Sequence, residues 1–115
     1  MSIKLTHQIS LAEAVALTGY YRADPVTNLP ICETFEKDSV LALLNQAGTR
    51  FLRIYQGRKP DNLLCAVLVA ANDLGQDILP SATGSSLAAA DDEGIILEDA
   101  FHCPPACPPP SPLNG

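Results

Sequence analysis

The chain has 115 residues, of which 47% are hydrophobic and 17% are charged. That composition is typical of a globular protein, and the length suffices for one hydrophobic core with little to spare. The formal net charge is −6, and no Lys or Arg offsets the acidic residues that follow position 80. Binding to nucleic acids depends on clustered basic side chains, so the sequence predicts no nucleic-acid partner.

Two features of the sequence bear on the cellular location of the protein. No apolar run approaches the roughly 18 residues of a membrane span, and the N-terminal residues lack the basic and apolar blocks of a signal peptide. We therefore expect a cytoplasmic protein with no membrane partner. Thiols are kept reduced in the cytoplasm. The four cysteines of the chain are accordingly expected to be free thiols, metal ligands or redox groups rather than structural disulfides.

Two helices are predicted in the first half of the chain. The first covers about residues 11–23, because Ser10 and Glu13 form the pattern of a capping box and apolar residues recur beyond them at helical spacing. A proline ends this helix, since α geometry is disfavoured in the residue before it. The second covers about residues 37–46, where apolar residues provide a buried face and Gly48 stands just past the end.

Strands are predicted mainly in the second half. Residues 51–56 follow a period of two, in which Leu52 and Ile54 share one face. Residues 63–71 form a continuous apolar run, which indicates a strand covered on both faces. A turn by composition separates them, so we expect an antiparallel hairpin. Residues 76–79 are a candidate edge strand, and residues 31–35 are a short extended segment.

These elements predict an α+β fold, with two helices packed on a small antiparallel sheet built around the hairpin. We divide the chain into a body at 1–79, an acidic linker at 80–102 with a possible short strand at 94–98, and a tail at 103–115. A sheet of two or three strands is marginal by itself. Because the 63–71 strand needs cover on both faces, a homodimer that pairs sheets or edges is expected.

The tail is the most distinctive segment, because it holds two cysteines and six of the ten prolines. Proline lacks an N–H and fixes φ, so the tail is expected to be extended and semi-rigid rather than helix or central strand. Extended proline-rich segments lose little entropy when they bind a protein partner. The predicted interaction residues are Cys103, Pro104, Pro105, Cys107, Pro108, Pro109 and Pro110.

His102, Cys103 and Cys107 also offer the ligand types that zinc prefers. A polyproline helix rises about 3.1 Å per residue, which separates the two cysteines by about 12 Å. Zinc holds its sulfurs at about 2.3 Å, and a disulfide needs Cα atoms within about 7 Å. The extended geometry therefore argues against both a shared zinc ion and a Cys103–Cys107 disulfide, although zinc stays an alternative.

The remaining cysteines are predicted to be structural. Cys65 lies inside the apolar run and is expected to be a buried small hydrophobe, and for Cys32 a core role is favoured over a nucleophilic one. A catalytic Cys–His pair needs a histidine that a third group orients, and neither His7 nor His102 stands in such a pattern. We therefore expect no enzymatic activity and identify no catalytic residue.

Four blocks of the sequence carry a resemblance. They are Ile9-Ser-Leu-Ala-Glu-Ala14 with Tyr21-Arg22, Pro30-Ile-Cys-Glu-Thr-Phe35, Leu52-Arg-Ile-Tyr-Gln-Gly57, and Cys103-Pro-Pro-Ala-Cys-Pro-Pro-Pro-Ser-Pro-Leu-Asn114. Together the blocks resemble a group of short bacterial proteins of unknown role that end in a Cys-Pro-Pro-x-Cys tail. The resemblance spans nearly the whole chain, the tail being its most specific part. It implies no activity and no functional residues.

Three functions fit these observations. The first is a non-enzymatic interaction module that presents its tail to a partner protein. The second is a thiol-redox or metal-binding protein, in which the tail cysteines, with His102 or Cys32, carry the chemistry. The third is the precursor of a modified peptide, with the tail as substrate. The body contains too much strand and core for a simple leader, so the precursor ranks last.

Overall fold

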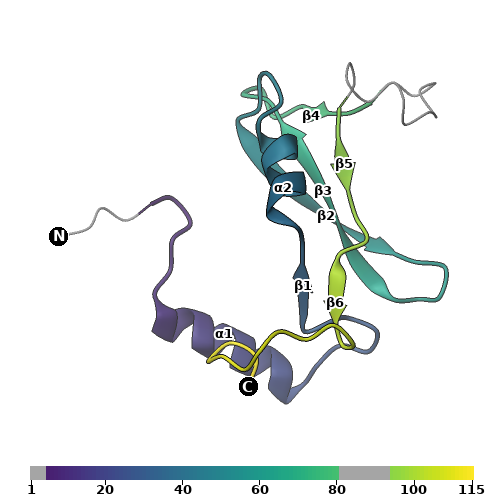
Figure 1. The fold of residues 1–115 in the computed structure, drawn as a ribbon. Coiled ribbons are helices and arrows are strands. Elements are labelled where there is room, and N and C mark those ends of the chain that lie inside the picture. Colours follow the sequence, from purple (N-terminus) through teal and green to yellow (C-terminus); the bar gives the residue numbers. More distant parts are fainter. Residues whose placement is uncertain (1–4, 81–93) are drawn as a thin grey trace.

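A computed structural model of the chain describes residues 5–80 and 94–115, and its elements confirm the α+β class (Figure 1). The elements in chain order are α1 (Leu11–Ala23), β1 (Cys32–Thr34), α2 (Lys37–Leu44), β2 (Phe51–Arg58), β3 (Leu64–Ala71), β4 (Asp77–Ile78), β5 (Ile96–Leu97) and β6 (Phe101–Cys103).

The main sheet is built around β3. Strands β2 and β3 form the predicted antiparallel hairpin, in a register that runs from Phe51 opposite Ala71 to Arg58 opposite Leu64. The other edge of β3 pairs antiparallel with β4 and, further along, with β5. Strand β3 is therefore central, as its continuous apolar run predicts. The edge strand expected within 76–79 and the short strand expected within 94–98 are β4 and β5.

One small apolar core joins α2 to this sheet. Leu43 of α2 is fully buried against Leu68 and Ala70 of β3, and Phe35, Ile78 and Leu97 pack around them. Leu68 and Ala70 lie two residues apart and so share one face of the strand. Helix α2 covers that face. The apolar residues that predict α2 and those that predict β3 therefore meet in one core.

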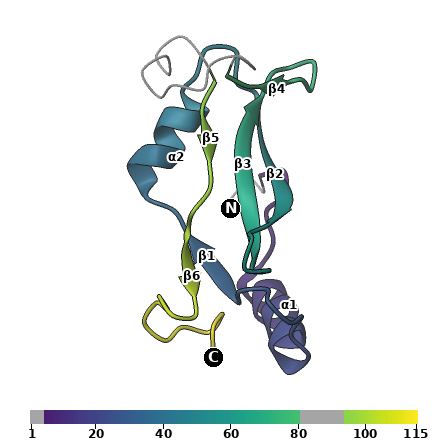
Figure 2. The same cartoon turned by 90° about the vertical axis from the view of Figure 1, so that its right-hand side faces the viewer.

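A second, two-stranded sheet lies beyond the first. Strands β1 and β6 pair antiparallel with Cys32 opposite Cys103, Glu33 opposite His102 and Thr34 opposite Phe101. Figures 1 and 2 show this pair at the same end of the molecule as α1 and the chain terminus, away from α2 and β4. The sequence predicts the extended form of β1, whereas β6 lies where linker and tail were expected to meet.

Helix α1 has the predicted boundaries and the predicted capping box, in which the Ser10 side chain accepts from the Glu13 N–H and Glu13 accepts from the Ser10 N–H. It contains no buried residue, so α2, not α1, is the helix that covers the sheet. Near its C-terminus Arg22 donates a hydrogen bond to the carbonyl oxygen of Leu113. Helix α1 is thus tied to the end of the chain.

Two further expectations concern the acidic linker and membrane-spanning helices. Most of the predicted acidic linker, 81–93, lies outside the described residues, and its last part, 94–102, includes β5 and the first two residues of β6. Among the helices that the structure describes, none has the length and hydropathy needed to cross a membrane.

Candidate functional site

Cys103 and Cys107 form a disulfide, with their Cα atoms 4.4 Å apart. The prediction that these two cysteines are too far apart to bond is therefore wrong. The reason is a turn directly after β6, in which the Ala106 N–H donates to the carbonyl oxygen of His102 at 2.7 Å. This turn reverses the chain within four residues, so the rise of a polyproline helix does not apply between the two cysteines.

The two sulfurs of this disulfide occupy different surroundings. Cys103 is the last residue of β6 and is only 1% exposed, whereas Cys107 lies in the exposed loop. The other predicted interaction residues, Pro104, Pro105 and Pro108–Pro110, are exposed as well. The disulfide thus connects a buried strand residue to a surface loop, and a molecule approaching from solvent reaches the Cys107 side first.

Cys32 is the third member of the cluster. It is a free, partly buried cysteine of β1 and stands directly opposite Cys103. Directly opposed residues of an antiparallel pair point to the same face, with Cα atoms about 4.5–5.5 Å apart. Disulfides span Cα distances of about 4.4–6.8 Å, so this position suits a bond to the same sulfur. The structure therefore gathers three of the four cysteines at one place.

Sequence reasoning missed the place of Cys32. The residue stands in a segment correctly predicted to be extended, but the partner strand lies far away in the chain and is only three residues long. Short strands carry no periodicity that distinguishes one partner from another. The available signal was that Cys32 and Cys103 both lie in short segments with extended character.

His102 and Glu33 form the neighbouring pair on the opposite face. The Nδ1 of His102 lies 3.4 Å from Oε1 of Glu33, and the same oxygen accepts from the N–H of Ala66 at 3.2 Å. Both ring nitrogens of His102 are buried without a hydrogen-bond partner. This pair connects β1 and β6 to the start of β3, and so attaches the two-stranded sheet to the main one.

The predicted zinc ligands are not brought together as a set. His102 and Cys103 are successive strand residues, and successive side chains of a strand point to opposite faces. Within residues 5–80 and 94–115, no three His, Cys, Asp or Glu side chains are grouped so that they could hold a metal ion. Cys103 and Cys107 are also oxidised here, and zinc binds thiolates.

Cys65 is the cysteine that stays outside the cluster. It is buried in β3 opposite Gly57, as its place in the apolar run predicts. Burial raises the pKa of its thiol, and the negative charge of Glu98 adds to that effect. A Cβ at Gly57 would stand 3.0 Å from the Cys65 sulfur, so the glycine leaves room for it. Cys65 is therefore poorly suited to act as a nucleophile at neutral pH.

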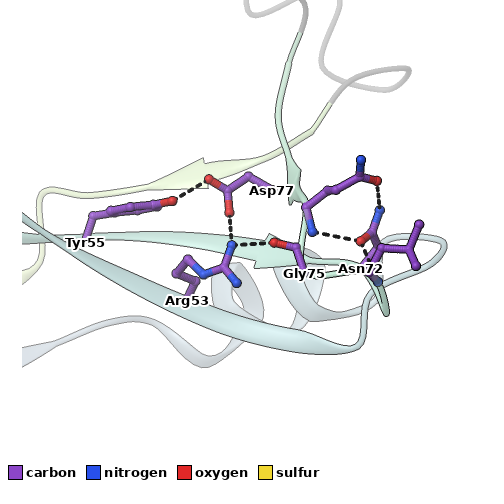
Figure 3. A network of polar contacts seen from close by, with 7 residues as sticks. Arg53, Tyr55, Asn72, Gly75 and Asp77 are labelled. Atoms are coloured by element: carbon purple, nitrogen blue, oxygen red, sulfur yellow. Dashed lines mark hydrogen bonds and ion pairs between the residues drawn. The ribbon is translucent and has the colours of Figure 1, made fainter.

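A separate group of polar side chains, here called the polar clamp, consists of Arg53, Tyr55 and Asp77 (Figure 3). Arg53 Nη1 lies 2.5 Å from Asp77 Oδ1 and also donates to the carbonyl oxygen of Gly75 at 2.9 Å. The Tyr55 hydroxyl donates to Asp77 Oδ2 at 2.6 Å. This hydroxyl and the Arg53 guanidinium lower the pKa of Asp77.

The polar clamp connects two strands of the main sheet. Arg53 and Tyr55 come from β2 and Asp77 from β4, so the clamp passes over the intervening β3. Val69, which stands opposite Arg53 on β3, is 2% exposed. The clamp therefore holds the short strand β4 and covers the face of β3 that α2 does not reach.

No family of proteins, no curated protein and no solved structure matches this chain. The resemblance to bacterial proteins with a Cys-Pro-Pro-x-Cys tail stays a prediction from the sequence.

Proposed function

We propose that this protein is a thiol–disulfide protein, in which Cys103 and Cys107 cycle between a disulfide and two thiols. The observation that carries the proposal is the bond between a buried strand cysteine and an exposed loop cysteine, beside a further free cysteine. Purely structural disulfides have no need of a thiol next to them. A neighbouring thiol is what thiol–disulfide exchange requires.

The proposed location strengthens this assignment. A cytoplasmic protein has its thiols held reduced, and the disulfides that do form there are usually transient and serve catalysis or redox sensing. The bond closes a loop with a sequence separation of only four, so it constrains the loop far more than the whole chain. Its formation and loss therefore change the exposed tail and leave the core of Leu43 and Leu68 intact.

The exchange is chemically balanced with a disulfide oxidant of the glutathione class. The thiolate of Cys107 attacks a sulfur of the oxidant, forms a mixed disulfide and releases one thiol. Cys103 then attacks the Cys107 sulfur, closes the protein disulfide and releases the second thiol. Reduction by a dithiol follows the reverse course and begins at Cys107, the exposed residue of the pair.

A second candidate function is the interaction module predicted from the tail. It is favoured by the way the tail is held, since Cys103 anchors one end in β6 and Leu113 accepts a hydrogen bond from Arg22 near the other. The exposed prolines between these anchors form a preordered surface for a partner protein. The precursor hypothesis gains nothing from such an anchored tail.

The test is an equilibrium titration of the purified protein in glutathione buffers of increasing oxidised fraction, with acid quenching, alkylation and intact mass. We expect two thiols to be lost and recovered reversibly as a pair, and in a Cys32→Ala variant, where Cys32 cannot take part, they map to Cys103 and Cys107. Cys65→Ala, which changes the buried cysteine, serves as the matched control and keeps the same midpoint.

Two outcomes of this titration would contradict the redox assignment. If Cys103 and Cys107 stay reduced at every ratio, the pair is not a redox couple. If they stay bonded at every ratio in the folded protein, the disulfide is structural and the interaction module becomes the better explanation.

A further inference from the structure

We infer that Cys32 is an internal exchange partner, which moves the disulfide from Cys103–Cys107 to Cys32–Cys103 and so delivers a free thiol at Cys107. The inference rests on the proposed redox function and adds a third participant and a direction to it. In the sequence Cys32 is expected to be a core residue, and its role emerges from the pairing of β1 with β6.

The step needs no external oxidant or reductant. Cys32 loses its proton to solvent, and its thiolate attacks the sulfur of Cys103. The Cys32–Cys103 bond forms as the Cys103–Cys107 bond breaks, and the departing Cys107 thiolate takes a proton from solvent. One disulfide and one thiol are present before and after the step, so the atoms and electrons balance.

The geometry favours attack at Cys103. Cys32 and Cys103 are directly opposed across an antiparallel pair, whereas Cys107 lies beyond the turn that follows β6. The N–H of Ile31 donates to the carbonyl oxygen of Cys103 at 2.9 Å, and the Glu33–His102 pair follows directly on the other side of Cys32. The two strands are thus fixed immediately before and after the exchanging residues.

The two sulfurs of the tail disulfide are open to different thiols. Cys103 is 1% exposed, so a large partner in solvent is kept from it, while Cys32 already stands beside it inside the protein. Cys107 is exposed and has no such neighbour across a strand pair. The internal thiol therefore acts at Cys103, and a protein or glutathione disulfide acts at Cys107.

Exchange also changes what the disulfide constrains. The tail bond closes a loop of a few residues, whereas a Cys32–Cys103 bond joins β1 to β6 and encloses most of the chain. A crosslink across a longer loop removes more entropy from the unfolded chain. The relocated bond would therefore strengthen the two-stranded sheet while the tail loop opens.

The decisive experiment maps disulfides in the Cys65→Ala/Cys107→Ser double variant after oxidation with oxidised glutathione. Cleavage after Lys and Arg places Cys32 in the peptide 23–37 and Cys103 in the peptide 59–115. We expect these two peptides to be joined in the monomer, because Cys32 and Cys103 are then the only cysteines left. Monomer with both thiols free, or only intermolecular bonds, would overturn the inference.

A second measurement uses the oxidised protein with all four cysteines, in case the double variant does not fold. After oxidation the protein is freed of glutathione and treated with an alkylating reagent without reductant. We expect Cys107 to become alkylated as the Cys32–Cys103 bond accumulates, and this labelling to be lost completely in Cys32→Ala. Equal labelling of Cys107 in both proteins would exclude Cys32 as the exchange partner.

These experiments separate the inference from the proposed function. If Cys103 and Cys107 fail to cycle in glutathione buffers, the redox function itself fails. If they cycle with the same midpoint and rate in Cys32→Ala, and no Cys32–Cys103 bond forms in the double variant, the function stands and the internal exchange fails.

Discussion

The two sheets of this protein are held by different means. The main sheet is assembled from strands close together in the chain and is stabilised by apolar side chains, with Leu43 buried against Leu68 and Ala70. The β1–β6 pair joins segments that lie far apart in the chain, with a cysteine pair and a Glu–His pair between them. The apolar core and the cysteine cluster therefore lie in separate parts of the protein.

The largest expected effect comes from opening the apolar core. Leu43→Ala removes a fully buried side chain, and such truncations cost about 2–5 kcal/mol in the free energy of unfolding. Leu41→Ala on the same helix is the matched control, because Leu41 is 42% exposed. Urea unfolding should show a much larger loss for Leu43→Ala. Equal losses in the two variants would show that α2 does not seal the core as described.

An intermediate effect is expected at the two-stranded sheet. In a Cys32→Ala background, where Cys32 cannot replace the bond, adding Cys107→Ser removes the tail disulfide. The chain-entropy relation for a loop of this size predicts that the free energy of unfolding falls by about 2 kcal/mol. Hydrogen exchange should place the lost protection in β1 and β6 and leave β2 and β3 unchanged. Loss of protection throughout β3 would mean that the two sheets unfold as one unit.

The smallest effect concerns the polar clamp and depends on pH. The Tyr55 hydroxyl and the Arg53 guanidinium lower the pKa of Asp77 below 3.8, so the contribution of this carboxylate to stability is present above that pH. It is lost as the pH falls from 3.8 through the lower, folded-state value. Urea midpoints at pH 7 and pH 3 should therefore differ less in Asp77→Asn than in the unchanged protein.

Asp73→Asn is the matched control for the pH experiment, because Asp73 lies exposed in the turn between β3 and β4. It should retain the full difference between the midpoints at pH 7 and pH 3. If Asp77→Asn retains that full difference as well, the polar clamp contributes nothing to the pH dependence, and β4 is held by its backbone pairing with β3 alone.

Local patterns were enough to predict α1 and most elements of the main sheet. The capping box at Ser10 and Glu13 marks the start of α1, the apolar run at 63–71 marks β3, and the turn before it predicts the hairpin. Each of these signals acts between residues that are near in sequence. For the same reason Cys65 could be assigned to the interior directly from its neighbours.

The candidate site could not be predicted in the same way. The sequence identified Cys103 and Cys107 as notable, but extrapolating polyproline geometry across the pair led to the wrong distance. The turn that joins them depends on a hydrogen bond from Ala106 to His102, a residue of β6. Without knowledge of β6 that turn had no anchor, and without β1 opposite β6 the place of Cys32 could not be known.

The sequence alone therefore determined the fold class, the hairpin with its central strand, and the interest of the Cys-Pro tail. Only the tertiary structure decided that α2 rather than α1 covers the sheet, and that Cys32 stands opposite Cys103. The physical reason is the distance along the chain over which each interaction acts. Helix caps, turns and apolar periodicity are short-range and leave a pattern in neighbouring residues, whereas the pairing of two three-residue strands depends on how the whole chain returns upon itself.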